Sequence, residues 1–153
     1  MKTLAQADTV VEILRRLDSL QPTSVARWGR MSAPQMVRHL IDSAQVAFGT
    51  RSASDASSVL QRTVVKWIAL YAPMTWPPDI MTRPELDQVL GQGSTPGEFG
   101  SDVAELAAMT TRFGAQPRDA GWGRHPIFGT MSHAEWLRWA YLHTDHHLRQ
   151  FGA

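Results

Sequence analysis

Two serines mark the starts of two long helices and so set the frame of the fold. Ser32 stands three residues before Gln35, and Ser132 stands three residues before Glu135, which is the spacing of a capping box. Pro34 falls in the first turn of the earlier helix, where its missing N–H costs nothing. We therefore expect helices over about 33–48 and 132–152, the second of them ended by Gly152.

Apolar residues recur three or four positions apart in these two helices and in three other segments. The first is 8–20, the second is the shorter 59–71, and the third starts at or near Ser101 and reaches Phe113. No stretch alternates as a strand would, and the chain has no internal repeat. The sequence predicts an all-α protein.

The connections predict how the helices are ordered in space. About a dozen residues join the helix over 8–20 to the helix over 33–48, but roughly fifty separate the latter from the helix that starts near Ser101. Five prolines and three glycines lie between Ala72 and Gly97, so that part is expected to be a surface excursion. A crossover of this length suits two consecutive parallel helices, which predicts a four-helix bundle of up-down-down-up topology as one domain over 1–153.

Composition excludes several classes of partner and site. With 15 basic and 14 acidic residues the net charge is +1, which gives no reason to expect nucleic acid, a membrane surface or a polyanionic substrate. Cysteine is absent, so a metal would have to be held by His, Asp or Glu. No apolar run is long enough to span a membrane or to act as a signal sequence, so we expect a cytoplasmic protein.

Three of the six histidines lie within "YLHTDHHLRQFG", close to the end of the chain. His143 and His147 are four residues apart, so both point to one face of the helix and can share one ion. The same face carries Trp136 and Ala140, which indicates that it looks inward.

A third ligand is available from the helix that starts after Ser32. His39 is the only other histidine within an apolar helical face. It lies about 10 Å along its helix, and His143 and His147 lie about 5 to 11 Å from the end of theirs, so antiparallel helices would put all three at one level. The sequence thus predicts an open three-histidine metal site, completed by water or substrate.

The other polar candidates fit this site less well. His133 lies about 15 Å from His143 along the helix, His125 precedes a proline in a loop at the same distant end, and His146 is rotated by about 100° from His147. Asp145 projects to the opposite side, so "HTDHH" does not reproduce the zinc-protease signature. Asp42, one turn after His39, is expected to be a carboxylate that hydrogen-bonds to a ligand from behind, or a weak base.

Two interpretations remain open for the histidines themselves. They could be core-edge side chains hydrogen-bonded to backbone or to tryptophan indoles, with no ion present. The six tryptophans are expected to pack in the core or over the site rather than to form a binding box. Arg27, Arg30 and Arg149 could hold an anionic substrate, but solvated or paired surface positions are the favoured interpretation.

"RWGRMSAPQMVRHL" and "HPIFGTMSHAEWLRWAYLHTDHHLRQFG" together resemble the DinB superfamily of DinB/YfiT-like metalloenzymes, and in particular a branch known as a domain of unknown function. The resemblance implies a four-helix bundle, often a homodimer, that binds a divalent metal, zinc or nickel, through His39, His143 and His147. Many relatives follow the last ligand with Arg-Gly-Gln, whereas this chain has Leu148-Arg149-Gln150.

Characterised members of that superfamily imply two kinds of chemistry on a small-molecule substrate. One is thiol-dependent S-transfer, in which a low-molecular-weight thiol cosubstrate supplies the nucleophile that a cysteine-free chain lacks. The other is metal-dependent hydrolysis. No side chain is singled out as a general base, and a non-catalytic metal-binding or dimerisation bundle with structural histidines is the alternative from another class.

Overall fold

The computed structural model describes residues 1–78, 80 and 82–153 and contains five α-helices. These are α1 (Ala7–Asp18), α2 (Ala33–Ala47), α3 (Lys66–Tyr71), α4 (Phe99–Ala115) and α5 (His133–Gln150). A π-helical turn, η1 (Gln61–Val65), runs directly into α3, and a 3-10 turn, η2 (Pro84–Leu86), precedes α4. Within the described ranges there is no strand, so the predicted all-α class is confirmed.

Both predicted capping boxes are present. The Ser32 hydroxyl accepts a hydrogen bond from the Gln35 backbone N–H, and the Gln35 side chain accepts one from the Ser32 N–H. Ser132 and Glu135 repeat this exchange at the start of α5. Gly152 follows α5 with φ of +75°, a left-handed conformation that glycine adopts without strain. Capping chemistry therefore sets the ends of both histidine-bearing helices.

Helix α4 begins slightly before the predicted position near Ser101. Its N-cap is Glu98, whose carboxylate accepts hydrogen bonds from the N–H groups of Gly100 and Ser101 at 3.0 and 2.7 Å. A glutamate is not among the preferred N-cap residues, so the pattern rule placed the start two residues too late.

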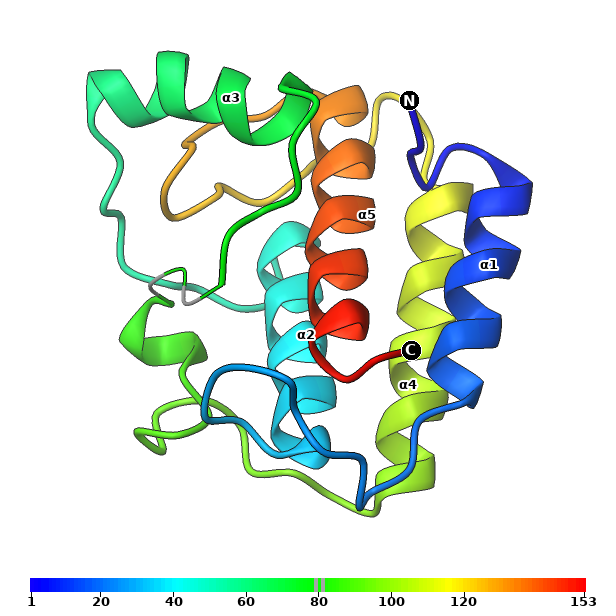
Figure 1. The fold of residues 1–153 in the computed structure, drawn as a ribbon. Helices are drawn as coiled ribbons and strands as arrows, with labels where there is room; N and C mark the ends of the chain where they lie inside the picture. Colours follow the sequence, from blue (N-terminus) through cyan, green and yellow to red (C-terminus); the bar gives the residue numbers. More distant parts are fainter. Residues whose placement is uncertain (79, 81) are drawn as a thin grey trace.

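The four longer helices pack side by side, two of them running in each direction. In Figure 1, α1 and α5 run downwards, and α2 and α4 run upwards. Helix α4 packs against both α1 and α2, and α5 contacts all three of them. Because α2 and α5 run in opposite directions, the middle of α2 faces the C-terminal half of α5.

The core lies between these helices. Most of its fully buried side chains come from α1, α2 and α5 and include Ile13, Leu17, Met36, Ile41 and Trp136. A core of this kind holds the backbones of α2 and α5 at a fixed separation, since close-packed interiors tolerate little displacement.

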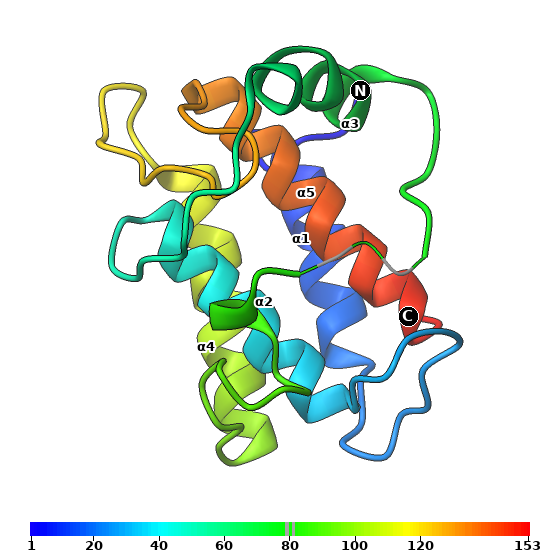
Figure 2. The ribbon, with the colours of Figure 1, turned by 90° about the vertical axis from the view of Figure 1, so that its left-hand side faces the viewer.

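Residues 49–98 form the connecting segment between α2 and α4. Helix α3 lies at one end of α5, where Lys66 pairs with Glu135 at 2.8 Å and the Arg138 Nε donates to the Leu70 carbonyl at 3.0 Å. After α3, Trp76 lies against His143 of α5, and η2 contacts α2, so described parts of this segment lie over the face on which α2 and α5 meet (Figure 2). The predicted surface excursion is therefore also the cover of that face.

Among the described residues, no helix is both long and apolar enough to cross a bilayer.

Candidate metal centre

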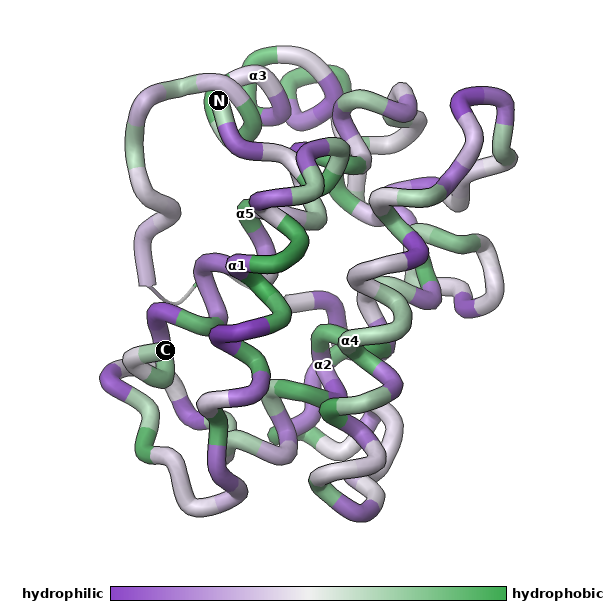
Figure 3. The backbone as a smooth tube through the Cα atoms, turned by 90° about the vertical axis from the view of Figure 1, so that its right-hand side faces the viewer, coloured by the Kyte–Doolittle hydropathy of each residue, from purple (hydrophilic) through white to green (hydrophobic). Residues whose placement is uncertain are grey.

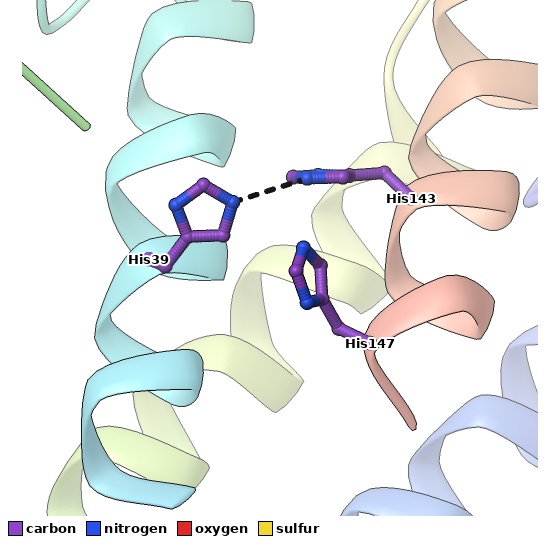
Figure 4. A group of neighbouring side chains, drawn as sticks. All are labelled: His39, His143 and His147. Atoms are coloured by element: carbon purple, nitrogen blue, oxygen red, sulfur yellow. Dashed lines mark hydrogen bonds between the residues drawn. The ribbon is translucent and has the colours of Figure 1, made fainter. Parts of the chain in front are cut away.

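Three imidazoles from two helices converge beneath the connecting segment (Figure 4). His39 extends from α2, and His143 and His147 extend from successive turns of α5. The Nε2 atoms of His39 and His143 are 3.2 Å apart, and one ligand atom from each of the three rings lies within 4.8 Å of the others. The structure thus brings together the three histidines that sequence spacing had singled out, and this group could hold a metal ion.

These separations suit a small divalent ion. Tetrahedral zinc with Zn–N bonds of about 2.0–2.1 Å keeps its nitrogen ligands roughly 3.4 Å apart. The His39–His143 distance is already close to this value, and small rotations of the rings would bring the remaining nitrogens to it. Neutral imidazole nitrogens are common ligands of zinc, nickel, copper and iron.

A backbone carbonyl fixes the orientation of the His39 ring. Nδ1 of His39 lies 2.8 Å from the carbonyl oxygen of Leu86 in η2. A carbonyl oxygen only accepts, so Nδ1 carries the proton and the lone pair is on Nε2, which faces the other two rings. The connecting segment therefore selects the tautomer of His39 that can bind a metal.

A side-chain amide performs the same task for His147. Nδ1 of His147 lies 2.8 Å from Oε1 of Gln150, and Nε2 of Gln150 donates to the Trp28 carbonyl at 2.8 Å. Because the amide nitrogen is engaged with a carbonyl, the amide oxygen is the atom that faces His147. His147 consequently donates from Nδ1 and keeps its Nε2 lone pair free for an ion.

His143 is positioned by aromatic rings. It stacks on Trp139, one turn earlier on α5, with centroids 4.7 Å apart and planes 25° apart. Trp76 of the connecting segment lies 6.2 Å from it on the outer side, and the Trp76 Nε1 donates to the Ala69 carbonyl at 2.8 Å. This indole partly covers the site and is tied to α3.

Burial keeps the three imidazoles uncharged near neutral pH. Burial lowers the pKa of His39, against a smaller opposing effect of the hydrogen bond to Leu86. Burial and then the neighbouring imidazoles hold the pKa of His143 well below 6.5, and burial does the same for His147. A neutral imidazole has the lone pair that coordination needs, so the site requires no deprotonation at physiological pH.

Asp42 does not play the role expected of it. Its fully buried carboxylate accepts hydrogen bonds from Gln88 Nε2 at 2.7 Å, from Arg51 at 3.1 Å, and from the backbone N–H and hydroxyl of Ser94. It has no hydrogen bond to an imidazole among the described residues, because side chains of the connecting segment engage both of its oxygens. The prediction of a carboxylate directly behind a ligand is therefore wrong.

The histidines left out of the predicted site also lie outside the observed cluster. His125 Nδ1 accepts from the N–H groups of Ile127 and Phe128, and burial lowers its pKa to about 3. His133 packs against Trp122. His146 is buried against Trp28 and Trp76, beside the cluster but not within it.

The charged residues near the C-terminus are engaged elsewhere. Asp145 accepts from Arg16 of α1 at 2.7 Å and from Arg149 at 2.9 Å, on the opposite side of α5 from the site. Arg149 is thus ion-paired, and Arg30 is exposed to solvent. The Arg27 guanidinium lies against Gly152, where a Cβ would be 2.7 Å from it. None of these contacts favours an anion-binding role for the three arginines.

Sequence reasoning missed the groups that orient the ligands. Leu86 acts through its backbone carbonyl, which no side-chain pattern can reveal. Trp76 is one of the six tryptophans expected in the core or over the site, but no motif singled it out as the one beside His143. Gln150 did leave a signal, since it is a polar residue three positions after His147 on a buried helix face.

The family model described as "Protein of unknown function (DUF1569)" matches residues 3–153, and the chain belongs to this family. No curated protein and no solved structure matches it.

Proposed function

We propose, taking membership of this family of unknown function as the premise, that the protein is a metal-dependent enzyme of the DinB type. His39, His143 and His147 would hold a divalent ion, zinc or nickel, through their Nε2 atoms. The observation that carries this proposal is the set of three neutral imidazoles, two buried and that of His143 half-buried, with ligand atoms within 4.8 Å of one another. Two of them have Nδ1 held by hydrogen bonds, as metal-binding histidines usually do.

The arrangement of the helices supports the DinB assignment. Helices α1 and α5 run one way, α2 and α4 run the other, and a long segment joins α2 to α4, which supports the proposal of an up-down-down-up four-helix bundle. One ligand from the second bundle helix and an H-x-x-x-H pair from the last are what the sequence resemblance implies for such a bundle.

The donor set favours an open site over a closed structural one. Structural zinc sites use four protein ligands, whereas catalytic sites keep one position for water or substrate. Over residues 1–78, 80 and 82–153, the cluster contains three candidate ligands, and the nearby carboxylate of Asp42 is turned to the connecting segment. We therefore favour a catalytic role over the non-catalytic bundle.

A divalent ion at this position would supply Lewis acidity and lower the pKa of a bound water or thiol. The chain's own residues do the positioning. Leu86 and Gln150 hold the Nδ1 protons of His39 and His147, and Trp76 and Trp139 enclose His143 and limit its access to bulk water. We propose a small-molecule substrate, with either a thiol cosubstrate, as in S-transferases, or water, as in hydrolases.

Cobalt substitution tests this proposal directly. Co²⁺-loaded protein should show tetrahedral absorption bands that shift when a small ligand enters the open position. A new thiolate-to-cobalt band on adding glutathione would support the transferase, and a shift with azide alone would support the hydrolase. Absorption bands that neither ligand alters would indicate a closed shell and overturn the catalytic proposal.

A further inference from the structure

The outer surface of residues 59–71 carries an unusual concentration of exposed apolar side chains. Trp67 is 61% exposed, Leu60 60% and Val64 52%, and Tyr71 remains 39% exposed. We define the α3 face as the seven large apolar side chains exposed on η1, α3 and the turn before them: Val59, Leu60, Val64, Val65, Trp67, Ile68 and Tyr71. Figure 3 shows this hydrophobic stretch at the edge of the molecule, around the label α3.

The amphipathic pattern of this helix is turned outwards. Of residues 59–71, all of which the structure describes, Leu70 alone is buried. Of the two charged side chains, Lys66 is half-buried on the protein side, and Arg62 is exposed. Lys66 pairs with Glu135 of α5, and the stem of Arg62 lies over Gly129, where a Cβ would be 3.0 Å from its Cδ. A surface helix normally buries its apolar stripe, so this arrangement indicates that another surface covers the α3 face.

The polar groups of the same segment need no external partner. The Thr63 hydroxyl donates to the Val59 carbonyl at 2.8 Å, and the Gln61 side chain accepts from the Ser58 N–H at 2.7 Å. An incoming surface would therefore meet an apolar patch whose hydrogen bonds are already made, and desolvating it would leave few polar groups unpaired.

The chemistry of the face favours a second copy of this chain over a membrane or a charged partner. Helices that lie on anionic membranes flank their apolar side with several free Lys or Arg residues. Here Lys66 is engaged by Glu135, Arg62 is the one other basic side chain in residues 59–71, and the chain carries a net charge of only +1. An uncharged apolar face can meet its own copy across a two-fold axis without opposing like charges.

The area of the face is sufficient for such a pairing. Trp67 and Tyr71 together expose the equivalent of about one whole aromatic side chain, roughly 200 Å². With the aliphatic side chains the face would bury roughly 600 Å² per partner, which reaches the lower limit of specific interfaces at about 1,200 Å² in total. We propose that the α3 face is the interface of a homodimer, in which two chains pack η1 and α3 against each other.

Sedimentation equilibrium of the full chain, with a double variant and a matched control, tests this proposal. Wild type should sediment as a dimer at micromolar concentration, and Val64→Glu/Trp67→Lys as a monomer with an unchanged helical circular dichroism spectrum. Val11→Glu alters a residue of α1 that is 64% exposed and outside the face, so it should remain a dimer. A monomeric wild type, or a dimer that survives the double substitution, would overturn the proposal.

A cross-linking experiment provides a readout that does not depend on destabilising the chain. Since the protein has no cysteine, Val64→Cys introduces a single thiol in the middle of the α3 face. Mild oxidation should give a disulfide-linked dimer of Val64→Cys within minutes and little of it from Val11→Cys. Equal cross-linking of the two variants would contradict the proposal, as would a wild type that floats with anionic phosphatidylserine vesicles as a monomer.

Discussion

The helical frame of α1, α2, α4 and α5 and the connecting segment of residues 49–98 contribute to the same site but are held by different forces. The frame is fixed by apolar packing, with Trp136, Met36 and Ile41 fully buried. The connecting segment is attached to α2 mainly by polar contacts around Asp42, from Arg51, Gln88 and Ser94. The frame delivers the three imidazoles, and the segment supplies the Leu86 carbonyl and the Trp76 cover.

This difference indicates how the site can be both precise and open to ligands. Packed helices hold ligand positions rigidly, whereas a cover attached by hydrogen bonds can open locally at a lower free energy than global unfolding. The four predictions that follow separate the two regions, beginning with the largest expected effect.

Removing the Asp42 carboxylate, which attaches the connecting segment to α2, should lower the stability of the whole protein. Asp42→Ala leaves the Gln88 amide and the Ser94 N–H without their acceptor in a buried place, so we expect the free energy of unfolding to fall by about 3 kcal/mol. Urea unfolding would measure this loss of free energy. The matched control is Asp55→Ala, which breaks an ion pair with Arg124 in which both side chains are 49% exposed and should leave the midpoint unchanged. Equal midpoints for wild type and Asp42→Ala would contradict this account of the attachment.

Acid should destabilise the metal-free protein through the histidines of the frame. Burial lowers the pKa values of His39, His143 and His147 below 6.5, so below that pH the unfolded chain binds more protons than the folded one. The free energy of unfolding should then fall as the pH drops, by about 1.4 kcal/mol per pH unit for each imidazole that stays neutral.

Urea midpoints of the metal-free protein between pH 7.5 and 5 would measure this slope. His147→Gln should show a shallower slope than wild type, because one of the buried imidazoles with a lowered pKa is gone. A midpoint that is flat across this range would show that the imidazoles are already protonated or accessible to water in the folded state.

The hydrogen bond behind His147 should matter for metal affinity more than for folding. Gln150→Leu removes the acceptor of the Nδ1 proton, and loss of such a contact typically weakens metal binding 10- to 100-fold. Competition with a chromophoric chelator would measure the change. Gln150→Glu keeps an acceptor at the same place and should bind zinc more tightly than Gln150→Leu. Tighter zinc binding by Gln150→Leu than by Gln150→Glu would show that Gln150 does not support His147 as a ligand.

The Trp76 indole that covers the site should affect the rate of metal release more than the affinity for the metal. Trp76→Ala uncovers the outer side of His143, so we expect metal loss to excess chelator to accelerate a few-fold while affinity changes little. Stopped-flow chelation would give the rate. Leu90→Ala, at a residue 62% exposed in the same segment, is the control and should release metal at the wild-type rate. An unchanged rate in Trp76→Ala would mean that the indole does not limit access.

The two regions also differ in how far sequence reasoning could predict them. Capping boxes and apolar periodicity are local signals, and they gave the helix bounds and the common level of His39, His143 and His147. The contacts of Leu86 and Asp42 join residues about fifty positions apart through a chain without periodicity, so no local pattern reveals them. The sequence also did not predict that the apolar side of α3 faces outwards, because periodicity identifies an apolar stripe but not the direction in which it points.

Metal content of untagged protein, measured by mass spectrometry after incubation with zinc or nickel and gel filtration, tests the central claim most directly. The account predicts one divalent ion per chain in wild type and in His133→Ala, which alters a histidine of α5 outside the cluster, and less than a tenth of this in His143→Ala. A wild type that retains no ion, or a His143→Ala protein that retains as much as wild type, would contradict it.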